Sequence, residues 1–182
     1  MRFFIGITPP ETISKKIISF QKSFLNNDVP NLVEPHITVK STGGLTEDKL
    51  WLPKIESAIK SFSEFQISFE EVGNFDENII FLKPAFSQEL INLHKTLFDA
   101  AGPYYKDPTK KYFENDQYHP HLTLGAIKWG LTKKDIVEMV KRAELELKNL
   151  PAFKVNSIRI YQENAEKKSW NMILDIQFGR KF

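Results

Sequence analysis

The sequence predicts an α+β domain with a mainly antiparallel sheet. Three observations lead to this fold class. Strand and helix patterns are mixed along the chain, neighbouring strands are joined by hairpin-type turns, and one strand–helix–strand order occurs twice. The 182 residues, of which 41% are hydrophobic, are enough to build the core of a single domain over residues 1–182.

The first half of the chain alternates strand and helix signals. An apolar run closed by Pro9 and Pro10 predicts a buried strand, and apolar residues at helical spacing follow it. β-Branched residues alternate with polar ones after Pro35, which predicts a second strand. A helix then begins at a Thr46 cap, with an expected kink at Pro53. The expected elements are strands at 2–8, 35–40 and 65–75 and helices at 10–25 and 46–62.

The second half repeats these signals and ends in two strands. A strand closed by Pro84 leads to a helix with Ser87 as its cap and Gly102 as its stop. A long polar and aromatic loop at 103–118 precedes the next strand, and Thr132 caps the helix after that. The expected elements are strands at 78–84, 119–127, 152–163 and 170–178 and helices at 86–102 and 132–149, with a hairpin turn between the last two strands.

Composition excludes several kinds of chemistry. Because the chain has no cysteine, it has no disulfide, thiolate metal site or cysteine nucleophile, and a reducing compartment is the natural expectation. The net charge of +2 favours a nucleotide or an RNA end over a long duplex as substrate. The first apolar run is interrupted at Pro9 and no stretch reaches about 18 apolar residues, so we expect a soluble, cytoplasmic protein with no membrane partner.

The repeated unit ends in a short motif that contains histidine and threonine. Each half has a strand closed by proline, then a helix, then Pro-His-aliphatic-Thr-aliphatic, which reads "PHITV" at 35–39 and "PHLTL" at 120–124. The second copy is longer, and the loop at 103–118 accommodates the difference. A structural alternative is a duplicated strand whose histidine faces the core, but two matches in equivalent contexts favour a functional site.

Strand alternation places the polar residues of each motif together. His36, Thr38 and Lys40 share one face of their strand, and His121 and Thr123 share one face of theirs, with aliphatic residues behind. If the two halves pack as pseudo-symmetric lobes, these faces can meet at one site. Two histidines suit in-line displacement at phosphorus, since near neutral pH one imidazole can take a proton while the other gives one. Each threonine hydroxyl can donate to a phosphoryl oxygen, and no metal or cofactor is required.

These motifs resemble the signature of the two-histidine phosphoesterase superfamily, which includes 2'-5' RNA ligase-like proteins and cyclic nucleotide phosphodiesterases. The resemblance covers nearly the whole chain: "FFIGITPPE", "PHITVK", "LHKTL", "HPHLTLG" and the closing "WNMILDIQF". It implies a bilobal, pseudo-two-fold α+β fold, with two mainly antiparallel sheets, flanking helices and a central cleft.

The same resemblance implies a catalytic set and a reaction. The set is His36, Thr38, His121 and Thr123. The reaction is metal-free hydrolysis of a 2',3'-cyclic phosphate, commonly to a 2'-phosphate, or related handling of 2'-5'-linked RNA ends. Many relatives carry arginine two residues before the second catalytic histidine and three residues after its threonine, where this chain has His119 and Ala126.

Four further residues are candidates for contacts with the substrate. They are His119, Lys40, Tyr118 and Tyr112. His119 would touch phosphate or base at the edge of the site, and Lys40 either attracts a phosphate or ends its strand in solvent. The two tyrosines belong to a loop that interleaves aromatic and basic residues, a pattern that can stack a base; a surface loop without a role is the alternative.

Two other functions stay open. A binding module of the same fold would hold a nucleotide or RNA end without turnover. A metal-dependent hydrolase would use His119 and His121, with Glu114 and Asp116 as the nearby carboxylates. His94, among leucines in its helix, is expected to be structural. We expect no metal, no cofactor and no obligate protein partner.

Overall fold

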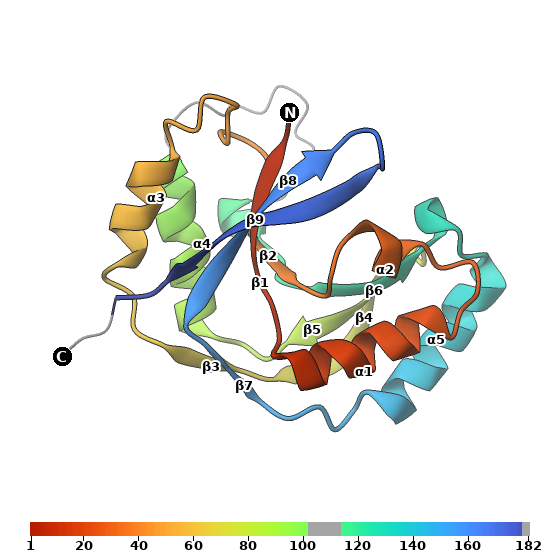
Figure 1. The fold of residues 1–182 in the computed structure, drawn as a ribbon. Coiled ribbons are helices and arrows are strands. Elements are labelled where there is room, and N and C mark those ends of the chain that lie inside the picture. The colour runs from red at the N-terminus through yellow and green to blue at the C-terminus, as the bar shows by residue number, and fades with distance from the viewer. Residues whose placement is uncertain (102–113, 180–182) are drawn as a thin grey trace.

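A computed structural model describes residues 1–101 and 114–179 (Figure 1). The helices and 3-10 turns are α1 (Glu11–Lys22), α2 (Val29–Leu32), α3 (Leu52–Ile59), α4 (Gln88–Ala101), η1 (Asn115–Gln117), η2 (Ile127–Trp129) and α5 (Lys133–Glu146). The strands are β1 (Phe3–Ile7), β2 (Ile37–Lys40), β3 (Phe65–Ile67), β4 (Phe69–Phe75), β5 (Ile79–Pro84), β6 (Leu122–Ala126), β7 (Phe153–Val155), β8 (Ser157–Asn164) and β9 (Ser169–Gln177).

The strands form one large antiparallel sheet and one small one. The large sheet has seven strands in the order β4-β5-β6-β2-β1-β8-β9, and β3 pairs with β7 in the small sheet. The predicted α+β class with antiparallel sheets and flanking helices is therefore confirmed. The strands that follow the two proline-histidine motifs, β2 and β6, are neighbours at the centre of the large sheet.

The sequence repeat corresponds to a structural repeat. The first unit is β1-α1-β2 and the second is β5-α4-β6, and in each unit the two strands pair antiparallel with each other. The units meet where β2 pairs with β6, and this pairing has one register position, Ile37 opposite Leu122. The two halves of the site are therefore joined by a very short backbone ladder.

Each helix of the repeat packs on the strand of the other unit. α1 contacts β6 and α4 contacts β2, while α3 lies beside α4 at one end of the molecule (Figure 1). Buried polar side chains fix how each helix packs on the strand of the other unit. The Gln21 amide donates to the Thr123 carbonyl at 3.0 Å, and the His94 ring bonds the Val39 carbonyl at 2.9 Å. These bonds satisfy backbone carbonyls that the short central ladder does not pair.

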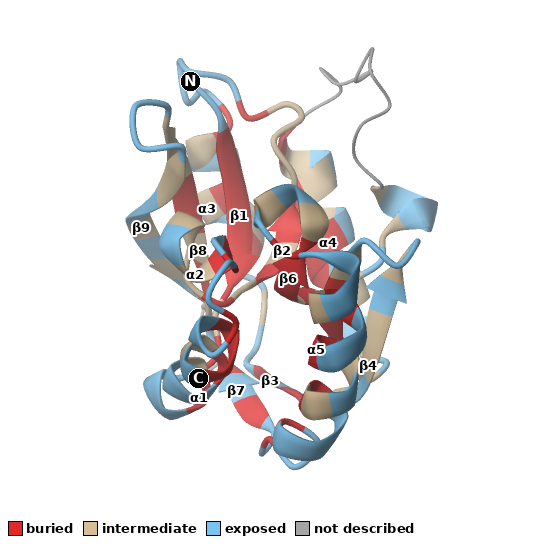
Figure 2. Cartoon of the chain, turned by 90° about the vertical axis from the view of Figure 1, so that its right-hand side faces the viewer, coloured by how far each residue is buried: buried red, intermediate tan, exposed pale blue. Residues whose placement is uncertain are grey.

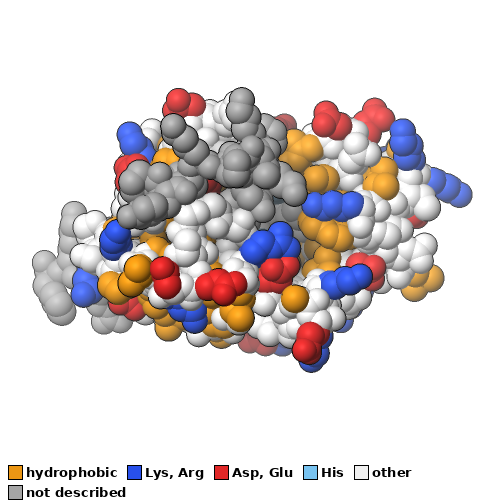
Figure 3. Space-filling model, turned by 90° about the horizontal axis from the view of Figure 1, so that it is seen from above, with side chains coloured by type: hydrophobic (Ala, Val, Ile, Leu, Met, Phe, Trp, Pro, Cys, Tyr) orange, Lys and Arg blue, Asp and Glu red, His pale blue; other side chains and the backbone are white. Residues whose placement is uncertain are grey.

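The aliphatic residues of the two motifs form the centre of the core. Ile37, Val39, Leu122 and Leu124 are fully buried. Figure 2 shows β1, β2 and β6 buried, while the outward face of α5 is exposed. Charged side chains of both signs are mixed over the face seen in Figure 3, in keeping with the net charge of +2.

Two predicted strands divide into shorter ones that belong to different sheets. The stretch 65–75 breaks after Ile67 into β3 and β4, and the stretch 152–163 breaks at Asn156 into β7 and β8. Alternation continues across the first break, from Phe65 and Ile67 to Phe69, so the sequence pattern did not reveal it. At the second break the polar pair Asn156 and Ser157 shifts the alternation by one residue, a signal that the prediction of a single strand overlooked. The partner strand decides the break, because β3 and β7 pair with each other away from the large sheet.

The prediction for residues 46–62 was too long at its N-terminal end. The helix α3 starts at Leu52, and Pro53 lies in its first turn, where the missing proline N–H costs no hydrogen bond. Thr46 does not cap this helix; its hydroxyl bonds Asp48 and its carbonyl accepts from the Trp51 indole. The caps at Ser87 and Thr132 are confirmed by their bonds to Leu90 and Asp135. Gly102, the predicted end of α4, lies outside the described residues.

The short helix α2 was missed, because Val29–Leu32 is a single turn with no helical repeat. Among the residues that the structure describes, no helix is long and apolar enough to cross a membrane.

Adjacent asparagines after α1 give a matched test of this packing. The buried Asn27 amide donates to the Leu124 and Gln21 carbonyls, whereas Asn26 is exposed. Asn27→Ala leaves these carbonyls without a donor, so we expect a free energy of unfolding lower by about 2 kcal/mol in urea denaturation. Asn26→Ala is the control and should change it by less than about 0.5 kcal/mol. Equal effects of the two substitutions would contradict the assigned role.

Candidate active site

The four residues of the two motifs gather on one face of the central sheet. Ile37 of β2 lies opposite Leu122 of β6 in an antiparallel pair, and both point into the core. Extending this register by one step along each strand places His36 opposite Thr123 and Thr38 opposite His121 on the other face. Directly opposed residues have Cβ atoms about 5 Å apart. The site is therefore a square with the two histidines on one diagonal, and all four side chains are half-buried.

Both motif histidines are held in the same way by their own backbone. The Nδ1 atom of His36 is 2.8 Å from the Glu34 carbonyl oxygen, and that of His121 is 2.7 Å from the His119 carbonyl oxygen. A carbonyl only accepts, so each Nδ1 carries a proton. In the neutral ring this leaves Nε2 as a base, and neither Nε2 hydrogen-bonds any of the described residues.

Aromatic rings from neighbouring strands enclose each histidine. The ring of His36 lies 4.8 Å from Phe4, and the ring of His121 lies 5.1 Å from Phe75 in an edge-on contact. Each histidine also contacts a second ring: Tyr161 lies beside His36, and Phe81 lies beside His121. Gly6 of β1 lies against the ring of His36: an added Cβ would stand 3.4 Å from that ring and 3.3 Å from the Ile37 carbonyl oxygen.

Burial makes both histidines neutral in the free protein. Burial, with a smaller contribution from the nearby His121, lowers the pKa of His36 to about 4, while the bond to the Glu34 carbonyl acts in the opposite direction. Burial also lowers the pKa of His121, and His119 adds to this effect. The influence of His121 on the pKa of His36 agrees with the placement of both rings on one face. A negative phosphate between them would favour the protonated form of either ring.

A charged network behind His36 was not anticipated from the sequence. The Glu34 carboxylate accepts from Arg159 at 2.7 Å and from the Tyr161 hydroxyl at 2.9 Å, while Arg159 also forms a two-pronged pair with Asp175. The network fixes the residue whose carbonyl orients His36. Arg159 lies on β8, with β1 between it and β2, and it is 125 residues from Glu34 in sequence, so no local pattern revealed it.

The structure changes the roles expected for two of the four additional candidates. Lys40 is fully buried and pairs with Glu114 at 2.7 Å, so the prediction of a phosphate contact or a solvated strand end is wrong. Tyr118 is half-buried, and its hydroxyl donates to the Thr38 carbonyl at 2.8 Å rather than to open space. His119 is exposed, as expected for the edge of the site, and Tyr112 lies outside the described residues.

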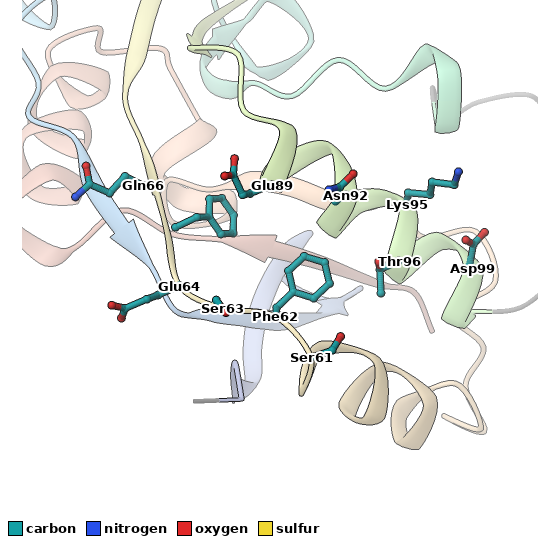
Figure 4. A pocket seen from close by; sticks show the side chains of 11 residues that line it. Ser61, Phe62, Ser63, Glu64, Gln66, Glu89, Asn92, Lys95, Thr96 and Asp99 are labelled. Atoms are coloured by element: carbon teal, nitrogen blue, oxygen red, sulfur yellow. The ribbon is translucent and has the colours of Figure 1, made fainter. Parts of the chain in front are cut away.

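One groove among the described residues lies away from the four motif residues. It has a volume of about 860 Å³ and lies between α4 and residues 61–66. In Figure 4 it is lined by Glu89, Asn92 and Lys95 from α4 and faces Phe62. None of the four motif residues lines it, and its mixed acidic, basic and amide groups point to no single ligand.

No metal-binding set is assembled in residues 1–101 and 114–179, where no three histidine, aspartate or glutamate side chains come together. The Nδ1 atom of His121 faces its own backbone, which leaves one ring nitrogen. A metal site built on His119 and His121 therefore has no third ligand in this part of the chain.

Comparison with known proteins agrees with this geometry. The family model described as the 2'-5' RNA ligase superfamily matches residues 9–167. A protein of Methanocaldococcus jannaschii named RNA 2',3'-cyclic phosphodiesterase is 28% identical, over 85% of this chain and 91% of its own. One of Archaeoglobus fulgidus with the same name is 29% identical, over 70% of this chain and 73% of its own.

Solved structures share the fold at low sequence identity. TT0787 of Thermus thermophilus aligns with a TM-score of 0.70 at 14% identity over the whole of both chains. LigT of E. coli in complex with 3'-AMP aligns with a TM-score of 0.63 at 14% identity over 98% of both chains. At this identity the likeness concerns the fold.

The buried state of His36 predicts a pH dependence of stability. Its pKa is lowered in the folded protein, so the unfolded chain takes up the proton first and unfolding is favoured as pH falls from about 6.5 towards 4. His36→Asn keeps a donor near the Glu34 carbonyl but cannot titrate. Urea denaturation at several pH values should show a smaller loss of stability for His36→Asn than for the unaltered protein over this range. Parallel curves would contradict the lowered pKa.

Proposed function

The chain belongs to the 2'-5' RNA ligase superfamily, and from this membership we propose that it is a metal-independent phosphodiesterase that opens 2',3'-cyclic phosphates on nucleotides or RNA ends. The observation that carries the proposal is the square of two histidines and two threonines on one face of β2 and β6, where neither Nε2 atom hydrogen-bonds a residue that the structure describes. The relatives named RNA 2',3'-cyclic phosphodiesterase support the substrate class.

Hydrolysis needs one base and one acid on opposite sides of the phosphorus. The neutral imidazole removes a proton from water through Nε2 while the water oxygen bonds to phosphorus. The bond from phosphorus to one ribose oxygen breaks, and the imidazolium gives that oxygen its proton. When the 3' oxygen leaves, the product is a 2'-phosphate. His36 and His121, at the ends of the diagonal, fit these two positions.

The threonines supply neutral donors to the phosphoryl oxygens. Thr38 and Thr123 lie beside the histidines, and their hydroxyls can donate to charge that grows as the fifth bond to phosphorus forms. Neutral donors matter here because Ala126, at a position where relatives carry arginine, is fully buried and Lys40 is paired below the site. The exposed His119 supports a weaker contact at the edge.

A binding module without turnover is the second candidate, and the buried Ala126 favours it. The deciding experiment is a panel of 2',3'-cyclic nucleotides, RNA with a cyclic end and 2'-5'-linked dinucleotides, assayed with a chelator present. Turnover excludes the binding module, and turnover that survives exhaustive chelation excludes the metal-dependent hydrolase.

Single substitutions of the two histidines should have similar and non-additive effects. We expect His36→Ala and His121→Ala each to lower kcat on a cyclic nucleotide roughly 10²- to 10⁴-fold, because each removes one proton transfer. The double variant should be little worse than the poorer single variant, since the two act as a unit. His119→Ala is a comparison that should act mainly on KM, because only the backbone carbonyl of His119 holds His121. Full activity in either single histidine variant would contradict the assignment of His36 and His121 as the acid–base pair.

The hydroxyl contribution can be separated from packing by isosteric changes. Thr38→Val and Thr123→Val keep the branched shape and remove the donor, so we expect kcat to fall roughly 10- to 100-fold each. Thr38→Ser and Thr123→Ser should restore most of the rate. If serine proves as poor as valine at both positions, the hydroxyls are not the groups that stabilise the phosphoryl charge.

A further inference from the structure

His94 makes a contact with each half of the site. Its ring is buried in α4, with Nδ1 2.9 Å from the Val39 carbonyl oxygen of β2. The backbone N–H of Asn115 donates to its Nε2 atom, also at 2.9 Å. A carbonyl only accepts and an amide N–H only donates, so these two partners fix a neutral ring with its proton on Nδ1.

The same ring supports the segment that leads into β6. Tyr118 stacks on His94 with ring centroids 3.8 Å apart and planes 6° apart. The Tyr118 hydroxyl donates to the Thr38 carbonyl at 2.8 Å. Tyr118 directly precedes His119, whose carbonyl holds the Nδ1 atom of His121. A continuous series of contacts therefore runs from β2 through His94 and Tyr118 to His121.

Glu114 adds an ionic contact at the start of this segment. Its carboxylate accepts from the Lys40 ammonium at 2.7 Å and from the Ser41 N–H at 3.0 Å. The segment before β6 is thus tied to its surroundings at three points. Glu114 and Tyr118 bond groups on β2, and Asn115 bonds His94 on α4. Since β2 and β6 share one register position, these side-chain contacts carry much of their alignment.

The charged groups around His94 come from three elements. Glu114 lies in the segment before β6, Lys40 on β2 and Asp99 on α4 itself. The two carboxylates favour a charged ring and the ammonium opposes it, but burial is the largest effect and lowers the pKa of His94. The neutral ring that the hydrogen bonds require is therefore also the form that the surroundings favour.

We propose that His94 is a positioning residue that locks the segment Glu114–Tyr118 onto β2 and so sets the separation of the two His–Thr pairs. It touches no reacting atom and acts through Val39, Asn115 and Tyr118. The proposal rests on the proposed function for its kinetic consequence, because a change in separation of a fraction of an ångström alters the alignment of both proton transfers. The same proposal gives Tyr118 a role in holding this segment on β2, in place of a contact with the substrate.

Two variants with one control test the proposal. His94→Phe keeps the ring that stacks on Tyr118 but removes both hydrogen bonds, and we expect kcat on a 2',3'-cyclic nucleotide to fall roughly 10- to 100-fold. Tyr118→Phe removes only the bond to the Thr38 carbonyl, and kcat should fall about threefold to tenfold with KM nearly unchanged. Lys95→Ala, an exposed neighbour on α4, is the control and should match the unaltered protein. If His94→Phe does not fold, Tyr118→Phe decides.

Spectroscopic measurements keep the test independent of turnover. Long-range ¹H–¹⁵N spectra of the unaltered protein at neutral pH should show the His94 proton on Nδ1. Amide exchange at Asn115 should be faster in His94→Phe, and the ring signals of His36 and His121 should shift in both variants. If neither the unaltered protein nor any variant turns over a cyclic substrate, the proposed function fails. The spectroscopic measurements still test whether His94 positions the segment Glu114–Tyr118.

Several results would overturn the proposal. A proton on Nε2 of His94 would exclude the assigned bonds. A raised KM with unchanged kcat in Tyr118→Phe would make that tyrosine a substrate contact. Unshifted His36 and His121 signals in both variants, together with unchanged exchange at Asn115, would show that His94 does not set the geometry of the site.

Discussion

The single backbone pairing between Ile37 and Leu122 is the constraint on which the site depends. It joins two strand–helix–strand units into one seven-stranded sheet. Because side chains alternate along a strand, burying these two residues brings the residues on either side of them to the opposite face. The same pairing therefore builds the core and brings the four motif side chains together, and a slip of one residue would exchange the two faces.

Such a short ladder leaves backbone carbonyls of both strands to be satisfied by side chains. Gln21 and Asn27 from the first unit bond the carbonyls of Thr123 and Leu124, and His94 from the second unit bonds that of Val39. An unpaired buried carbonyl costs free energy, so these polar residues stabilise the sheet while they fix where its two halves lie. Stability and the geometry of the site are therefore coupled through the same bonds.

Burial also sets the electrostatics of the histidines. Burial lowers the pKa of both motif imidazoles, while each Nδ1 is held by a carbonyl two residues earlier in the chain. The free protein thus presents two neutral rings with the same tautomer. In the proposed reaction an anionic phosphate would favour protonation of one ring, so the substrate itself would complete the acid–base pair.

Local patterns were enough to predict the class of fold, the repeat and the four motif residues, because alternation and duplication can be recognised in a single chain. The pairing of side chains and strands that lie far apart in sequence became known only from the tertiary structure. Lys40 obeys the same alternation as Thr38, yet Glu114, 74 residues away, pairs with it in the interior. The breaks between β3 and β4 and between β7 and β8 depend on which strand lies alongside. The roles of Glu34, Arg159 and His94 likewise arise from partners distant in sequence, since hydrogen bonds and burial depend on proximity in space.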